Sequence, residues 1–260
     1  MRSDDRALRL GTSGWSHRDW AGKLYPHDMP AADYLSAYAQ HFATVEIEST
    51  FYDIPSPQTV RAWYHRAPDD FLFCPCVPRA ITHDQRLDRT SDILKAFLNA
   101  ISGLGEKLGP LLLQLPDNFR YAEWELFQAF LQSLPSYFQF AVEFHHGSWI
   151  KDTTFTLLES HDMAWVVVDA PFLPRIARVT APFAYVRWHG RPGIAQRARN
   201  EVDPASALRP WAPILRDLQR QCDRVYGFVR NSFSGYAPRD CHTLLHLTGG
   251  STRMELPRRS

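Results

Sequence analysis

The stretch Phe140–Trp149 carries residues whose types and spacing could do acid–base chemistry. It begins as an apolar run and continues through Glu143 and His145. If it is a strand, successive side chains point to opposite faces, so Glu143 and His145 share one face. A carboxylate beside an imidazole can move protons or bind a metal ion, and it can also be a purely structural pair. The stretch is therefore a candidate site only if other polar residues join it.

The same arrangement recurs where other apolar runs end. Polar residues at or just after these ends are Glu46, His83, Gln114, Asp169, Arg187, His189, Arg230 and Asn231. Burying Glu46, Glu143 and Asp169 together is costly unless a cation or a proton compensates their charges. Because perturbed ionisable groups gather at functional sites, the sequence predicts a reaction centre at these ends.

The predicted roles follow from the chemistry of each side chain. Glu143 or Asp169 would act as a general base or a metal ligand, and His83 or His189 would donate a proton. Arg187 would bind an anionic group of the substrate. In the alternative interpretation, Arg187 neutralises one or two carboxylates in a structural network. The identity of any metal stays open, because the sequence has no HExxH motif or comparably close ligand spacing.

Aromatic side chains crowd the same predicted loops, where they could form a stacking floor for a base or a sugar ring. An arginine at a strand end would then meet a phosphate. The predicted ligand-binding residues are Ser13, Trp15, Tyr52, Gln114, His145, Trp149, Arg230 and Asn231. The simpler alternative is that these rings only pack the loops.

The elements that must position these residues alternate along the chain. Besides the opening stretch, the predicted strands are 8–10, 44–48, 71–77, 111–115, 164–168, 184–189 and 224–229. The predicted helices are 31–42, 57–66, 91–101, 124–134, 155–158, 205–218 and 238–247, with a loop at 171–179. The alternation predicts a TIM-type eight-stranded parallel (β/α) barrel, with a doubly wound open sheet as the alternative. A barrel is favoured because it would bring the polar strand ends to one face.

Length and composition are typical of a globular protein. The 260 residues are predicted to form a single α/β-barrel domain, with a core at 8–247 and a loose tail at 248–260. The formal charge of +1 gives no support to broad, unspecific binding of nucleic acid. No stretch approaches the roughly 20 apolar residues that cross a bilayer, and no secretory signal is recognised, so a cytoplasmic location is expected. No membrane and no protein partner is implied.

The four cysteines do not predict a disulfide framework. Cys74, Cys76, Cys222 and Cys241 are few and widely spaced in a chain of this length. Cys74 and Cys76 also lack the two-residue spacer of redox and zinc motifs. We expect packed thiols without a chemical role.

Eight sequence blocks carry a resemblance to a known family. They are GTSGWSHRDWAGKLYP, VEIESTFYDIP, PRAITH, LLLQLP, VEFHHGSW, VVVDAP, YVRWHG and NSFSGYAP, between Leu10 and about Leu247. Together they resemble the YecE-like family, also known as domain of unknown function 72. The resemblance implies an eight-stranded α/β barrel with a polar pocket at the strand ends. The matching positions are Gly11, Ser13, Gly14, Trp15, Glu46, Thr50, Phe51, Tyr52, Thr82, His83, Gln114, Glu143, Trp149, Asp169, Arg187, His189 and Gly190.

Four positions depart from the family pattern. Glu48 stands where the family usually has Asn, and Cys76 stands where a Lys is common. His145 replaces the usual Arg, and Arg230 replaces an Asn. Two expected cations are therefore missing, while a carboxylate and an Arg are gained. Such a pocket is expected to bind a different ligand or to have lost the family's activity.

The leading functional hypothesis is a hydrolase that acts on a phosphorylated sugar or a nucleic-acid fragment, with or without a divalent metal. It rests on polar strand ends converging beside aromatic loops. One alternative is a non-catalytic protein that binds a nucleotide or an oligonucleotide at the same mouth. A third and weaker hypothesis is metal-dependent sugar isomerisation. Its only basis is that the family's barrel resembles the fold of metal-dependent endonucleases and sugar isomerases.

Overall fold

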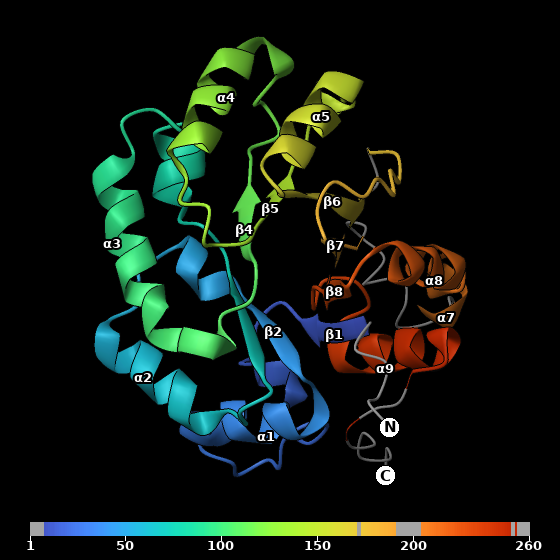
Figure 1. The fold of residues 1–260 in the computed structure, drawn as a ribbon. Coiled ribbons are helices and arrows are strands. Elements are labelled where there is room, and N and C mark those ends of the chain that lie inside the picture. Colours follow the sequence, from blue (N-terminus) through green and yellow to red (C-terminus); the bar gives the residue numbers. More distant parts are fainter. Residues whose placement is uncertain (1–7, 171–172, 191–203, 251–252, 254–260) are drawn as a thin grey trace.

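The computed structural model describes residues 8–170, 173–190, 204–250 and 253. Its strands are β1 (Leu8–Thr12), β2 (Thr44–Ile47), β3 (Leu72–Pro75), β4 (Leu111–Gln114), β5 (Phe140–Glu143), β6 (Ala164–Asp169), β7 (Phe183–Trp188) and β8 (Arg224–Val229). The helices are α1 (Tyr34–His41), α2 (Pro57–Arg66), α3 (Ser91–Ile101), α4 (Trp124–Ser133), α5 (Asp152–Ser160), α7 (Pro204–Leu208), α8 (Trp211–Gln221) and α9 (Ala237–Thr248). Figure 1 shows the helices outside the strands, with α7, α8 and α9 gathered beside β1 and β8.

The expected closed eight-stranded barrel is wrong. The strands form a half-barrel of six parallel strands in the order β1-β8-β7-β6-β5-β4, and β2 and β3 form a separate two-stranded parallel sheet. Among the described residues, the two sheets are joined by isolated β-bridges, such as those of Ser13 with Glu46 and of Cys76 with Leu112. The fold is α/β, as the alternation predicted, but the ladder of hydrogen bonds is not continuous.

A tyrosine hydroxyl interrupts the ladder between β1 and β2. Tyr38 of α1 accepts a hydrogen bond from the Thr12 N–H at 2.9 Å and donates one to the Thr44 carbonyl at 3.1 Å. These are the strand groups that a direct ladder bond would join. Gly11 permits the close approach, because a Cβ at this position would lie 2.2 Å from the Thr44 carbonyl oxygen. The strands therefore pack closely without pairing along their length.

Prolines interrupt the ladder between β3 and β4. Pro75 ends β3 and Pro110 directly precedes β4, and neither has a backbone N–H to donate. The hydrogen bonds that remain are Gly109 N–H to the Phe73 carbonyl, at 2.7 Å, and Val77 N–H to the Leu112 carbonyl, at 2.8 Å. The expected barrel fails here because two donors are missing from the sequence.

The strands have an apolar cluster on each face. One cluster lies between the strands and the helices, and the strands enclose the other. Trp165 and Val167 of β6 pack with residues of the surrounding helices. Val166 and Val168 belong to a second cluster that the strands enclose. The enclosed cluster also contains Cys74 and Cys76, and all four cysteines are free and buried, so the expectation of packed thiols is confirmed.

Several predicted elements differ in their bounds. The prediction of a single helix at 205–218 is wrong. The structure has two helices there, α7 and α8, separated by Arg209 and Pro210. A proline inside a helix removes a hydrogen bond and clashes with the preceding turn, so the chain breaks there. Of the predicted loop at 171–179, residues 173–179 have no regular structure, and Pro171 and Phe172 lie outside the described residues.

The ends of the chain are only partly described. Of the tail predicted at 248–260, Thr248 closes α9, and residues 251–252 and 254–260 lie outside the described residues. Within the described residues, the helices are too short or too polar to cross a membrane.

Candidate functional site

Three charged side chains meet between the six-stranded and the two-stranded sheets. Glu46 on β2, Glu143 on β5 and Arg187 on β7 are buried, with exposed fractions of 0, 0 and 1%. Arg187 Nη2 donates to Glu46 Oε1 at 2.7 Å, and Nη1 donates to Glu143 Oε2 at 2.6 Å. One guanidinium thus joins the two-stranded sheet to the six-stranded sheet.

Neutral groups supply further hydrogen bonds to this trio, although the buried Arg187 Nε has no hydrogen-bond partner among the described residues. Glu46 accepts from the Ser13 hydroxyl at 2.7 Å and from the Tyr185 hydroxyl at 2.8 Å. Arg187 Nη1 also donates to the Gln114 side-chain oxygen at 3.2 Å. Each carboxylate therefore has at least two partners, which is what burial of a charge requires.

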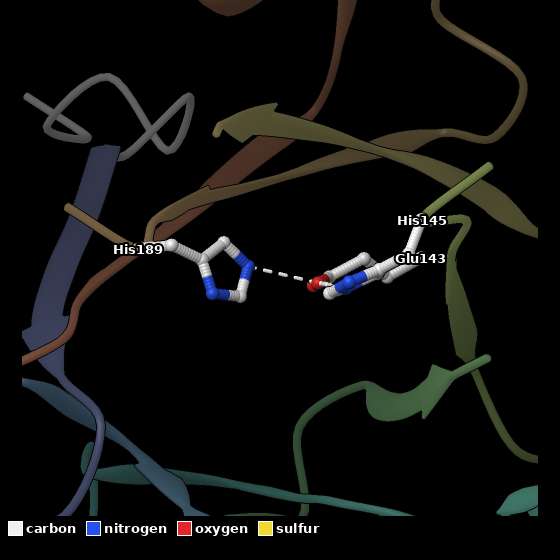
Figure 2. A group of neighbouring side chains, drawn as sticks. All are labelled: Glu143, His145 and His189. Carbon is white, nitrogen blue, oxygen red and sulfur yellow. Dashed lines mark hydrogen bonds and ion pairs between the residues drawn. The ribbon is translucent and has the colours of Figure 1, made fainter. Parts of the chain in front are cut away.

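Two imidazoles converge on the remaining oxygen of Glu143. His189 Nε2 lies 2.8 Å from Glu143 Oε1, and His145 Nε2 hydrogen-bonds to the same oxygen. Figure 2 shows His145 and Glu143 arriving from one side and His189 from the other. The two rings meet edge to face, with centroids 5.5 Å apart. Glu143 thus points one oxygen at the buried arginine and the other at the histidines.

The charges shift the pKa values of this cluster. Burial alone would raise the pKa of Glu143, but Arg187, His189 and His145 outweigh it and hold that pKa well below its usual range. Burial lowers the pKa of His189. The Glu143 carboxylate acts to raise this pKa, and the Arg187 guanidinium lowers it further. Glu143 is consequently ionised and His189 neutral near pH 7.

A second ion pair lies next to the histidines. Arg230 Nη2 donates to Glu48 Oε1 at 2.5 Å, and both side chains are partly exposed. Arg230 Nη1 lies 3.5 Å from His189 Nδ1, which makes it a long contact. Arg230 therefore connects the imidazoles with the solvent-facing side of the cluster.

An open pocket of about 360 Å³ adjoins the cluster. Ser13, which bonds Glu46, lines the pocket. Glu48, which bonds Arg230 at the edge of the cluster, lines it as well. Trp15 and Tyr52 line it as well, and Tyr52 is 65% exposed. The pocket offers an aromatic wall and polar groups within reach of one ligand.

The structure brings together most of the predicted site residues. Glu46, Glu143, Arg187 and His189 meet in the cluster, joined by Ser13, Gln114 and His145, while Arg230 lies at its edge and Trp15 and Tyr52 line the pocket. Four predicted residues lie elsewhere: His83, Trp149, Asp169 and Asn231.

Asp169 ends β6 on the face opposite the cluster. Val168 belongs to the enclosed layer, so the next side chain points the other way. Asp169 Oδ1 accepts a hydrogen bond from Arg175 Nη2 at 3.1 Å, and that guanidinium lies over the Trp211 ring. The carboxylate therefore contributes to packing outside the strands.

Trp149 and Asn231 have structural partners. Trp149 is fully buried, stacks on Phe119 with centroids 5.5 Å apart, and donates from Nε1 to the Phe119 carbonyl. Asn231 accepts from Trp20 Nε1 at 2.9 Å and from the Ala237 N–H at 3.2 Å. Neither side chain is free to contact a ligand through these groups.

His83 lies near the mouth but outside the hydrogen-bonded cluster. It sits in a π-helical turn, Ala80–Asp84, with Nδ1 2.8 Å from the Thr82 hydroxyl and its ring edge-on to Phe51. Burial, followed by Arg79, lowers the pKa of His83. Its part in proton transfer stays a prediction.

The sequence reasoning missed Tyr185. This residue is two positions before Arg187 on β7, so strand alternation places both on the enclosed face. The signal was therefore present in the Tyr-Val-Arg spacing. The sequence places Glu48 on the strand face of Glu46 and marks it as a departure from the family pattern. The structure pairs it with Arg230, the other charged residue that departs from that pattern.

A metal ion could be held by Glu143, His145 and His189. One ligand atom from each residue lies within 4.8 Å of the others. Among the described residues, no other group of at least three His, Cys, Asp or Glu side chains meets this criterion. One carboxylate and two imidazoles suit a divalent transition metal better than magnesium or calcium, which prefer oxygen ligands.

These observations define a class: an α/β protein of parallel strands whose carboxyl ends enclose a carboxylate–guanidinium–imidazole cluster. A family model described as "Protein of unknown function DUF72" matches residues 9–260. The chain belongs to this DUF72 family, as its sequence blocks indicated.

Individual relatives support the same assignment. The chain is 35% identical over 222 residues to UPF0759 protein YecE of Escherichia coli K12, covering 84% of this chain and 68% of that protein. It is 26% identical to UPF0759 protein YunF of Bacillus subtilis, covering 92 and 94% of the two chains. The crystal structure of a DUF72 family protein from Thermotoga maritima superposes with a TM-score of 0.80 at 27% identity, covering 93 and 99% of the two chains.

Proposed function

We propose that this protein is a hydrolase whose reaction centre is Glu143 with the imidazoles of His145 and His189. One observation carries the proposal: both Nε2 atoms converge on one oxygen of a buried carboxylate whose other oxygen Arg187 holds. A carboxylate in this position orients an imidazole and stabilises its protonated form when it takes a proton. The imidazoles would take a proton from the attacking water and return it to the leaving group.

The role first expected for Arg187 is reassigned in this proposal. Its guanidinium is buried and already bonded to Glu46, Glu143 and Gln114, so it has no face for a substrate anion. Arg230 is the better candidate to bind an anion, because it is partly exposed and lies beside His189. Arg187 instead holds Glu143 in position.

The proposed substrate is a phosphorylated sugar or a nucleic-acid fragment. Such a molecule combines an anionic group, which suits Arg230, with a ring that can lie against Tyr52 in the adjoining pocket. Because Glu48 already pairs with Arg230, substrate binding would have to displace or share this carboxylate. Only a strongly charged group such as phosphate would compete with this carboxylate for Arg230.

The test is a screen of phosphomonoesters, phosphodiesters and glycosides, each with and without divalent metal ions. We expect turnover of at least one phosphorylated substrate, and a fall of about 10²-fold or more in His189→Asn, the usual scale for general acid–base catalysis. His146→Asn is the matched control, because this neighbouring histidine bonds Ser148 and not Glu143. No turnover of any substrate, or equal turnover in both variants, would contradict the proposal.

A second candidate is a binding protein without catalytic activity. The observation that favours it is the exposed Tyr52 beside an open pocket, while Glu46 and Glu143 are sealed from solvent. This candidate predicts saturable nucleotide binding that survives Glu143→Gln and fails in Tyr52→Ala. Binding without turnover would favour it over the hydrolase.

A further inference from the structure

We infer that Glu143, His145 and His189 form a binding site for one divalent transition-metal ion of the zinc or cobalt type. The inference rests on the proposed function in one respect, since the ion would occupy the same reaction centre. Its binding can be measured without any substrate, so the two proposals can fail separately.

The donor atoms match this class of metal. Two imidazole nitrogens and one carboxylate oxygen are the protein ligands of several catalytic zinc sites, and the same set binds iron in non-haem enzymes. The three donors come from separate places: the end of β5, the residue two positions later and the residue after β7. Glu143 lies in the ladder of β5, whereas His145 and His189 lie just beyond the ends of β5 and β7, whose ladders fix the chain before them.

The present spacing is that of directly hydrogen-bonded groups, and it would have to widen to admit an ion. Two ligands bound at about 2.1 Å and at a tetrahedral angle lie roughly 3.4 Å apart. Glu143 Oε1 and His189 Nε2 are 2.8 Å apart, and all three donors lie within 4.8 Å of one another. Small rotations of the imidazoles would open room for the ion between them. Figure 2 shows the His189 ring directed at the Glu143 carboxylate, to which His145 Nε2 also hydrogen-bonds.

The charges of the cluster favour a cation at this point. The buried trio holds two carboxyl groups, of Glu46 and Glu143, and only one guanidinium, of Arg187. The oxygen of Glu143 that faces the histidines is the one Arg187 does not bond. A bound cation would lie between this oxygen and the partly exposed histidines.

The surrounding groups supply a second layer of support. Arg187 fixes the orientation of Glu143, and Gln114 and Glu46 fix Arg187 in turn. Such outer partners orient metal ligands and strengthen binding. Arg230 lies 3.5 Å from His189 Nδ1, but Glu48 holds it more closely, at 2.5 Å.

The site leaves room for a substrate or a water molecule. Three protein ligands are typical of catalytic sites, in which the remaining position stays open. The side chain of His145 is 26% exposed and that of His189 is 11% exposed, so solvent reaches one side of the group. On loading, each neutral imidazole would carry its proton on Nδ1 and present Nε2 to the ion, so the long contact of His189 Nδ1 with the Arg230 donor would have to open. The ion would then lower the pKa of a bound water, which is the chemistry a hydrolase needs.

The test is metal binding by the purified full chain without a histidine tag. After treatment with a chelator, Zn²⁺ is titrated by calorimetry, and Co²⁺ is titrated while its visible absorption is followed. We expect one equivalent to bind, and binding at least about a hundredfold weaker in His145→Ala and His189→Ala, since losing even an outer partner costs 10–100-fold. The matched control, His146→Ala, should bind like the wild type. Circular dichroism of each variant confirms that it is folded.

The possible results separate the two proposals. No stoichiometric binding by the wild type, or binding that both histidine variants retain, would overturn the metal site. Stoichiometric binding lost in both variants, without turnover of any substrate, would keep the metal site and remove the hydrolase. Turnover that persists in a metal-free protein would assign proton transfer to the imidazoles alone and overturn the metal's role.

Discussion

Arg187 is the residue on which the candidate site depends most. Its side chain is 1% exposed and bonds a carboxylate from each of the two sheets. Burial alone would lower the pKa of Arg187, but Glu143 and Glu46 raise it well above its usual range. The residue is therefore charged at any ordinary pH, and its charge is what makes the two buried carboxylates tolerable.

Replacing Arg187 by Met should destabilise the protein by about 3–5 kcal/mol, because two buried carboxylates lose their cation. The measurement is the free energy of unfolding in urea. Arg220→Met is the control, since its ion pair with Asp217 is exposed and such pairs contribute at most about 1 kcal/mol. Adding Glu143→Gln to Arg187→Met should recover part of the loss. Equal effects of the two arginine variants would contradict this account.

Tyr38 connects two strands, as Arg187 connects the two sheets. Its hydroxyl replaces a ladder hydrogen bond between β1 and β2. Tyr38→Phe would leave the Thr12 N–H and the Thr44 carbonyl without this partner in a buried place. We expect a loss of about 1–3 kcal/mol in the free energy of unfolding.

Tyr34 on the same helix provides the matched control for Tyr38. Its ring stacks on Tyr25, and among the described residues its hydroxyl makes no hydrogen bond. Tyr34→Phe should therefore change the free energy of unfolding by only a few tenths of a kcal/mol. A Tyr38→Phe effect of the same size would show that the hydroxyl does not join the strands.

The start of α9 contains a buried carboxylate that should make stability depend on pH. Burial raises the pKa of Asp240 to about 7, against the lowering effects of Ser234 and Arg239. Because the folded pKa lies above the unfolded value, this group's contribution is complete below about pH 4 and is lost as pH rises to about 7. Ser234 donates to Oδ2, and within the described part of the chain the buried Oδ1 has no hydrogen-bond partner.

Asp240→Asn should remove this dependence. Relative to the wild type, we expect the variant to gain stability between pH 5 and pH 8, by up to a few kcal/mol at about 1.4 kcal/mol per pKa unit. The measurement is urea unfolding at both pH values. Asp53→Asn, at an exposed carboxylate, serves as the control and should show no such gain. A pH-independent difference for Asp240→Asn would contradict the prediction.

At the scale of the whole molecule, the division into two sheets should appear in hydrogen exchange. Strand β8 pairs along its length with β1 and β7, whereas β2 and β3 pair fully only with each other. Amides of β8 should therefore exchange most slowly, and those of β2 and β3 should exchange together at a lower free energy of opening. Equal protection in all strands would show that the eight strands open as one unit.

Much of the site could be predicted from strand alternation. The spacing of Glu143 with His145, and of Arg187 with His189, places each pair on one face, and the structure has all four in contact. Asp169 was misplaced because β6 is apolar on both faces, so its alternation gives no sign of which face is enclosed. The helix expected over 205–218 is wrong because Pro210 interrupts it between α7 and α8.

The sequence by itself determined the family, the order of strands and helices, and which polar residues share a strand face, because these depend on local spacing and on matching blocks. Only the tertiary structure decided that the eight strands divide into six and two, that Arg187 is sealed rather than open to substrate, and that two imidazoles share one oxygen of Glu143. The physical reason is that these features depend on contacts between residues far apart in the chain, such as Tyr38 with Thr12 or Arg187 with Glu46. Periodicity shows which way a side chain points, but only packing shows what it meets.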